Sequence, residues 1–245
     1  MDKTTEPLGS FFIRDRRLKC HVVLAVSALY IAVNTNVFTL AFLAIYSFVF
    51  FLMLKKRLKR SILLVTIAIF SLGYKLFLFI DAPYHPGSLY SSYASIGLGI
   101  VMLKYMDAAV NRKRAKRFDD FLLYTLFFPS FLLGPVAKLD DFSLGRPRWL
   151  KGLKRLGIGL LVLIAFTAFY GLYDLVTDTG ILAYRMVSIL VFGFVFLTLV
   201  YSFFSIVIGA SYLIGVPLKE NFPTIPYLAK STGEFWRSWN ATVME

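Results

Sequence analysis

The stretch SILLVTIAIFSLGYKLFLFI, residues 61–80, carries a single charged side chain, Lys75. A transmembrane α-helix needs about 20 predominantly apolar residues, because each residue adds about 1.5 Å along the helix axis. Lys75 lies near the far end of the stretch, where a long lysine side chain can reach the lipid headgroups. The segment therefore predicts a membrane-spanning helix and indicates the class of the whole chain.

Three further stretches have similar length and hydropathy, and they cover residues 89–110, 156–176 and 186–210. The chain as a whole is 58% hydrophobic, with a mean hydropathy of +0.70. Soluble domains contain only about 45–50% apolar residues. We therefore predict an all-α fold, a polytopic bundle of transmembrane helices.

Two other apolar segments are interrupted by residues that break helices. Residues 22–54 are divided by the polar triplet NTN at 34–36, which predicts two short helices joined in a tight hairpin. The segment 119–142 contains Pro129 and then a glycine–proline pair, which predicts a broken or re-entrant helix. Such a break is tolerated inside a bilayer only where other parts of the protein cover the freed backbone groups.

The net charge of +13 comes from short basic runs at residues 14–19, 55–60, 112–117 and 146–155. Each run flanks an apolar segment, which is typical of cytoplasmic loops and not of a nucleic-acid-binding surface. If the hairpin leaves the membrane and returns, all four runs fall on one side. We therefore expect a multi-pass protein of the plasma membrane with a cytoplasmic N-terminus, in contact with membrane lipids and without a nucleic-acid partner.

The usual motifs of catalytic and metal sites are missing. The sequence contains neither H-E-x-x-H nor G-x-S-x-G. Only two histidines are present, His21 and His85, and neither belongs to a spacing pattern of metal ligands or of a catalytic triad, so no metal site is predicted. The glycine pairs at 97–99 and 157–159 lie inside apolar spans, without the strand and turn of a nucleotide site, and we interpret them as helix-packing glycines.

Polarity rises after Gly215, and the last segment reads GVPLKENFPTIPYLAKSTGEFWRSWNATVME. Residues 231–234 have the S-x-x-E spacing of a capping box and predict the start of a helix. On that helix Trp236, Trp239 and Asn240 share one face, at positions i, i+3 and i+4. Two interpretations are open: an interfacial aromatic belt, or a substrate-facing amide in the aromatic setting of a membrane enzyme.

The segment ENFPTIPYLAKSTGEFWRSWN, residues 220–240, resembles the signature of the membrane-bound O-acyltransferase (MBOAT) superfamily. It is most similar to the bacterial branch with alginate O-acetyltransferases and the protein that exports D-alanyl groups to teichoic acid. That branch has ENF, PYLA-S and an EFWRRWH-like helix in succession, and this chain has one extra residue between the first two elements. Residues 120–142 resemble the family's FFP…GPI…F region. Residues 201–222 resemble its YFDFSGYSDMAIGLARLFG stretch, with Ser202 or Ser205 at the acidic position.

The resemblance implies transfer of an acyl group, often acetyl, to a hydroxyl of a glycan or lipid of the cell envelope. The donor would be a cytoplasmic thioester, acyl-CoA or acyl carrier protein, and no tightly bound cofactor is implied. The resemblance assigns Asn240 to the catalytic centre, and Trp236, Arg237 and Trp239 to substrate binding. The bacterial branch usually has histidine at the place of Asn240, whereas lipid-modifying and protein-modifying relatives have asparagine or aspartate. An amide can orient a substrate but cannot act as a general base.

We divide the chain into a cytoplasmic basic segment (1–20), a transmembrane bundle (21–215) and the start of the active-site region (216–245). The family's invariant histidine follows a further helix and loop, so we expect an N-terminal portion of the enzyme that is inactive as residues 1–245 alone. The alternative is a truncated, non-catalytic membrane protein that binds partner proteins or lipids. The gene sequence past codon 245 distinguishes the two. A reading frame that continues and encodes a histidine in an apolar helix favours the enzyme, whereas a stop codon at this point favours the alternative.

The charge pattern predicts that residue 113 faces the cytoplasm and that residue 88 faces outward. The only cysteine is Cys20, so Cys20→Ser gives a cysteine-free background. In that background Ser88→Cys should react with a membrane-impermeant maleimide on intact cells, and Lys113→Cys should react only after lysis. Reaction of Lys113→Cys in intact cells would contradict the orientation.

Overall fold

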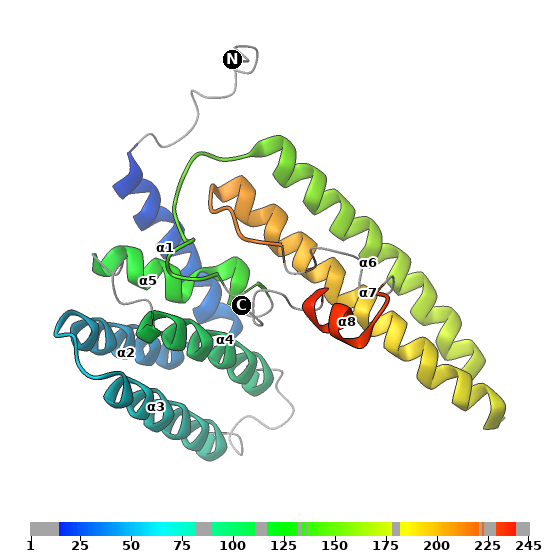
Figure 1. Ribbon diagram of the computed structural model, residues 1–245, viewed down its shortest axis with the longest axis horizontal. Helices are drawn as coiled ribbons and strands as arrows, with labels where there is room; N and C mark the ends of the chain where they lie inside the picture. The colour runs from blue at the N-terminus through cyan, green and yellow to red at the C-terminus, as the bar shows by residue number, and fades with distance from the viewer. Residues whose placement is uncertain are drawn as a thin grey trace, which may run out of the picture.

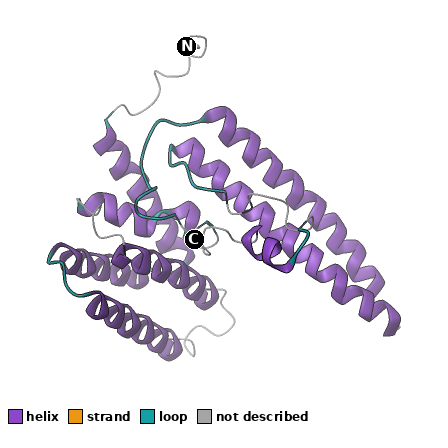
Figure 2. Cartoon of the chain, viewed as in Figure 1, coloured by secondary structure: helices purple, strands orange, loops and turns teal. Residues whose placement is uncertain are grey.

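The computed structural model describes residues 15–81, 90–110, 117–131, 134–135, 137–177, 182–220, 222 and 229–238. These residues form α-helices and one short 3-10 helix, and they contain no strand (Figures 1 and 2). The predicted all-α fold is therefore confirmed. In chain order the elements are α1 (Arg16–Asn34), α2 (Val37–Lys55), α3 (Arg60–Asp81), α4 (Tyr90–Val110), α5 (Phe118–Leu126), η4 (Phe128–Ser130), α6 (Trp149–Thr177), α7 (Leu182–Ile214) and α8 (Thr232–Ser238).

Within the described residues, four helices are long and apolar enough to cross a bilayer: α1, α2, residues 149–171 of α6 and residues 191–214 of α7. Many of their large apolar side chains are exposed, as expected for surfaces that contact lipid. The chain is thus a multi-pass membrane protein. The other two predicted spans coincide with α3 and α4; their membrane crossing stays a prediction.

The segment 22–54 differs from our expectation in the length of its helices. α1 and α2 have 19 residues each, which corresponds to about 28 Å at 1.5 Å per residue. Each can therefore cross a hydrocarbon core of about 30 Å, and the prediction of two short helices was wrong. The polar turn lies where it was expected, because the Asn36 side chain accepts the Thr39 N–H at 2.6 Å and caps α2.

The extra length of α1 comes from its basic first turn. Asp15 caps the helix by accepting the Arg17 N–H at 2.8 Å. The helix therefore begins at Arg16 and not near residue 21, where the cytoplasmic segment was expected to end. Two helices that each cross still return the chain to its starting side, so the charge-based topology is unchanged.

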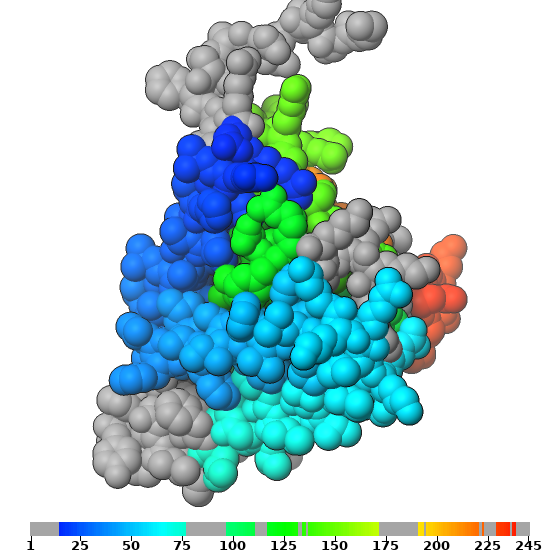
Figure 3. Space-filling model, turned by 90° about the vertical axis from the view of Figure 1, so that its left-hand side faces the viewer, coloured from blue at the N-terminus to red at the C-terminus, as the bar shows by residue number. Residues whose placement is uncertain are grey.

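α1 to α5 form one bundle, on the left in Figure 1. Its centre is aromatic and takes rings from several helices, including Tyr46 and Phe50 of α2, Phe70 of α3 and Tyr105 of α4. The ring centroids of Phe50 and Tyr105 lie 4.9 Å apart, and those of Tyr46 and Tyr105 lie 5.0 Å apart. Such tilted and edge-on contacts stabilise ring pairs beyond simple burial. Figure 3 shows α5 between α1 and the neighbouring α2 and α3.

α6 and α7 pack tightly along each other and extend away from the bundle in Figure 1. Glycines allow this close approach, because a Cβ at Gly209 would lie only 2.6 Å from the Leu156 backbone nitrogen, and one at Gly159 only 2.8 Å from that of Ile206. The interpretation as packing glycines is confirmed for one member of each pair. Gly159 packs against Ile206 of α7, and Gly97 packs against the Phe131 ring. Their partners, Gly99 and Gly157, have nothing within 4 Å of a Cβ.

α7 ends at a glycine with a left-handed backbone. Gly215 has φ of 92°, and the Val216 N–H donates to the Ser211 carbonyl at 2.8 Å, which is the Schellman pattern of a helix end. The Gly145 N–H donates to the Gly215 carbonyl at 2.7 Å, and Lys19 of α1 donates to the Gly145 carbonyl at 2.7 Å. These bonds join the end of α7 to the loop before α6 and to the start of α1.

Described parts of three basic runs lie near one another. Lys19, in the first run, contacts Gly145, which immediately precedes the run at 146–155. Arg16, at the start of α1, pairs with Asp120 in the first turn of α5, and Arg117, the last residue of the run at 112–117, lines the same pocket. The charge-based topology places these runs on one side of the membrane, which agrees with this proximity, and the orientation itself stays a prediction.

The close contact of α6 and α7 predicts different effects for two glycine-to-alanine substitutions. Gly209→Ala should lower the free energy of unfolding by about 1–3 kcal/mol, because backbone atoms of α6 occupy the space of the new methyl group. Gly157→Ala has open space and should be neutral or stabilising by up to about 1 kcal/mol, because alanine favours helix. Thermal unfolding in detergent would compare them, and equal stabilities would contradict the packing.

Candidate functional site

The four residues expected to form the site lie in α8 or beyond it. Arg237 is exposed in the last turn of α8. Trp236 belongs to the same helix, but its side chain is outside the described part of the structure, as are Trp239 and Asn240 altogether. The shared face of these residues therefore stays a prediction.

α8 begins as the capping-box spacing predicts. Ser231 Oγ accepts the Glu234 N–H at 3.1 Å, and the first helical residue is Thr232. The Glu234 carboxylate accepts the Lys230 N–H at 2.8 Å, one residue before the amide used in a standard capping box. These bonds give Glu234 a structural role at the start of the helix.

The segment between α7 and α8 is anchored to α6 through an arginine. Arg155 Nη2 donates to the Glu220 carboxylate at 2.5 Å, and Nη1 donates to the Tyr201 hydroxyl at 2.9 Å. The guanidinium also lies 5.2 Å from the centre of the Tyr201 ring. The Phe222 ring packs on the rings of Tyr201 and Phe204. Both ends of the ENF triplet, Glu220 and Phe222, are thereby fixed against α6 and α7.

A lysine is buried at the centre of the bundle. Lys104 of α4 is 1% exposed, and its ammonium donates to the Ser130 hydroxyl at 3.0 Å and to the Thr125 carbonyl at 3.3 Å. It also lies 5.8 Å from the centre of the Tyr124 ring. Ionisable side chains inside membrane proteins are costly and commonly mark functional sites. Lys104 is therefore the strongest candidate that our sequence analysis missed.

The lysine belongs to a larger polar network around the predicted helix break. Tyr124 Oη donates to Asp107 Oδ2 at 2.9 Å, and the Lys104 carbonyl lies 3.2 Å away. The same Asp107 oxygen accepts the Leu139 N–H at 2.5 Å. The carboxylate therefore connects α4 to α5 and to the chain beyond the break.

The break itself is present, as Pro129 predicts. α5 ends at Leu126, and a 3-10 turn follows at Phe128–Ser130. The Phe128 N–H donates to Ser27 Oγ of α1 at 3.2 Å, and the Thr125 carbonyl receives the Lys104 ammonium. Side chains of α1 and α4 thus satisfy backbone groups near the break, as buried irregular backbone requires.

A chain of hydroxyl groups closes the network on the α2 side. Ser47 Oγ lies 2.7 Å from Tyr105 Oη and 3.5 Å from Thr125 Oγ1. Gly134, just after the break, packs so closely that a Cβ would lie 2.8 Å from Ser130 Cα and 2.9 Å from Val207 of α7. The break is therefore enclosed by α1, α2, α4 and α7.

This arrangement can hold a broken helix in one position, and it can supply an ammonium, a carboxylate and several hydroxyls beside it. The sequence signal that could have found it is the pair Lys104 and Asp107, three residues apart within a predicted span. Arg155 gave no comparable signal, because it is the last residue of a basic run that the topology already explained. The described residues contain no group of three or more His, Cys, Asp or Glu side chains that could hold a metal ion.

No protein-family model matches the chain, and no curated relative matches it. The resemblance to the MBOAT superfamily therefore rests on the motifs themselves.

The hydrogen bond from the Phe128 N–H to Ser27 predicts how much the free energy of unfolding falls when the Ser27 hydroxyl is removed. Ser27→Ala should lower the free energy of unfolding by about 1–3 kcal/mol, because it leaves the Phe128 N–H without its acceptor. The control is Ser211→Ala, a fully buried serine whose hydroxyl, among the described residues, bonds only to the Ile208 carbonyl of its own helix. Thermal unfolding in detergent should show the smaller loss for Ser211→Ala, and equal losses would argue against the role of Ser27.

Proposed function

We propose that the chain contributes to a membrane O-acyltransferase, which transfers an acyl group from a cytoplasmic thioester to a hydroxyl of a cell-envelope glycan or lipid. The observation that carries the proposal is the setting of the motif segment. Glu220 is held by Arg155, and the helix of the EFWR motif is capped by Ser231. An aromatic belt facing lipid headgroups needs neither an ion pair at Glu220 nor a fixed helix start, whereas a catalytic segment needs both to hold its geometry.

In this proposal Asn240 provides hydrogen bonds and not proton transfer. Acyl transfer passes through a tetrahedral oxyanion, which oriented N–H donors stabilise. An amide offers two such donors but takes up no proton at neutral pH. His21 is exposed in the first turns of α1, beside the arginines at the basic end, so we do not assign it the role of general base. Asn240 then orients the acyl carbonyl or the acceptor hydroxyl.

The neighbouring residues have complementary roles in the proposed site. Trp236 and Trp239 supply apolar surface for the acyl chain or for a sugar ring. The exposed guanidinium of Arg237 attracts the anionic groups of the thioester donor. The acyl group and the acceptor within these classes are left open by the proposal.

The proposal predicts that Asn240→Ala loses turnover and not stability. In the product of the complete reading frame, consumption of acyl thioester with a hydroxyl acceptor should fall by roughly 10²–10³, the cost of one oriented donor in the transition state. The control is Asn34→Ala, the same chemical change at the end of α1, which should keep parental turnover.

Expression level and unfolding temperature should match the parent for both variants. Near-parental turnover of Asn240→Ala would make Asn240 an interfacial residue. A purified parent protein without turnover for any acceptor would favour the non-catalytic alternative that binds lipids or partners.

A further inference from the structure

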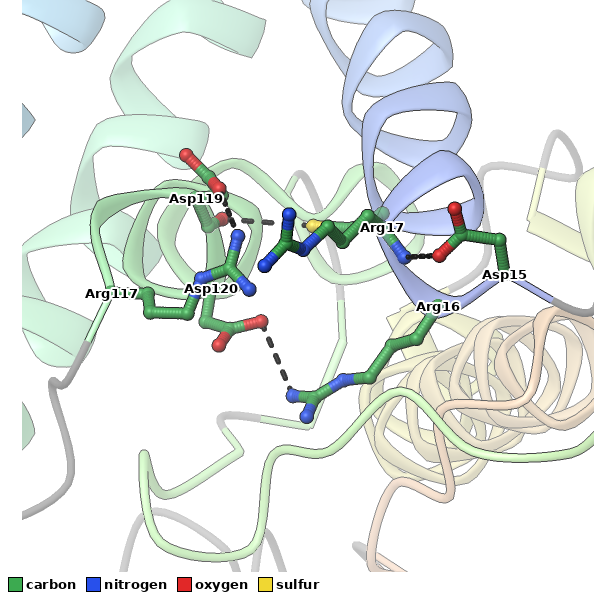
Figure 4. A network of polar contacts seen from close by, with 7 residues as sticks. Asp15, Arg16, Arg17, Arg117, Asp119 and Asp120 are labelled. Atoms are coloured by element: carbon green, nitrogen blue, oxygen red, sulfur yellow. Dashed lines mark hydrogen bonds and ion pairs between the residues drawn. The ribbon is translucent and has the colours of Figure 1, made fainter.

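A pocket lies at the basic end of the bundle, between the starts of α1 and α5 (Figure 4). Its lining includes a buried thiol and six polar side chains from the two helix starts: Arg16, Arg17, His21, Arg117, Asp119 and Asp120. The three guanidinium groups outnumber the two carboxylates, so the pocket carries a net positive charge.

Two of the three arginines are already paired. Arg117 Nη2 lies 2.7 Å from the Asp119 carboxylate, and Arg16 Nη2 lies 3.3 Å from that of Asp120. All four side chains are well exposed to solvent, so each pair contributes little stability and can rearrange around another anion.

The third arginine has its guanidinium available. Figure 4 shows the Arg17 side chain extending from α1 toward Arg117 and Asp119. Its backbone N–H donates to the Asp15 carboxylate at 2.8 Å. Within the described part of the chain, its guanidinium has no hydrogen bond or ion pair. Guanidinium groups bind phosphate through two parallel N–H donors, so Arg17 is suited to an anion that enters between the two helices.

The position of the pocket along α1 indicates that this anion comes from the membrane. α1 is a candidate membrane span, and the pocket occupies its first two turns. On the same turns Leu18 is 53% exposed and Val22 is 42% exposed, so an apolar surface for acyl chains begins at this level. Basic residues at such a boundary attract anionic lipids.

We propose that this pocket binds the phosphate of an anionic phospholipid headgroup. The phosphate accepts hydrogen bonds from Arg17. It also accepts hydrogen bonds from Arg16 and Arg117, which keep their pairs with the carboxylates of Asp120 and Asp119. The phosphate thus links the start of α1 to the start of α5. A soluble phosphate has the same chemistry but no reason to lie at the membrane boundary. This inference does not depend on the proposed acyl transfer.

The test uses the purified chain in phosphatidylcholine nanodiscs with increasing fractions of phosphatidylglycerol, with bound lipid measured by native mass spectrometry. Arg17→Gln should weaken the apparent affinity for phosphatidylglycerol about fivefold, the effect of one basic residue near a membrane surface. Arg60→Gln removes an exposed arginine at the start of α3, outside the pocket, and should leave the affinity unchanged. Asp120→Asn should strengthen binding, because it removes the carboxylate that competes for Arg16.

Three results would overturn the proposal. Equal weakening by Arg17→Gln and Arg60→Gln would show diffuse attraction to the membrane surface. Unchanged affinity in Arg17→Gln, with gel filtration showing a folded protein, would exclude the pocket. The third result concerns inorganic phosphate. If it displaces the lipid, and also binds in the absence of lipid with the same dependence on Arg17, the pocket is a site for free phosphate.

Discussion

The interior of a bilayer offers no water to backbone groups, so every break in a helix must be satisfied by other parts of the protein. The predicted re-entrant placement of the segment after α5 would make this constraint decisive for the first half of the chain. The break between α5 and η4 is stable because Ser27 of α1 accepts the Phe128 N–H and Lys104 of α4 donates to the Thr125 carbonyl. α1 and α4 therefore lie against α5, and the same contacts bury the Lys104 side chain.

A second constraint joins the paired helices α6 and α7 to this bundle. Gly215 ends α7 with a positive φ and bonds to Gly145, which Lys19 of α1 also contacts. Val207 of α7 packs near Gly134, just after the break. The start of the motif segment, where Glu220 bonds to Arg155, follows this junction by five residues.

Local features of the fold could be predicted from the sequence, and long-range pairings could not. Hydropathy located the apolar helices, Pro129 located the break, and the S-x-x-E spacing located the start of α8, because each signal lies within one helix turn or one span. The length of α1 was missed because its first turn is basic and was read as a loop. Lys104 contacts Ser130 across 26 residues and Arg155 contacts Glu220 across 65 residues, and no local pattern specifies such pairs.

The basic end of the molecule connects the two proposals through electrostatics. A cytoplasmic N-terminus, as the charge pattern predicts, would make this end face the compartment that supplies thioester donors. Its positive potential would raise the local concentration of donors that carry phosphate groups. A lipid phosphate bound between Arg16, Arg17 and Arg117 would neutralise part of that potential. Occupancy of the lipid pocket and attraction of an anionic donor would therefore oppose each other, most strongly at low ionic strength, where the screening length is longest.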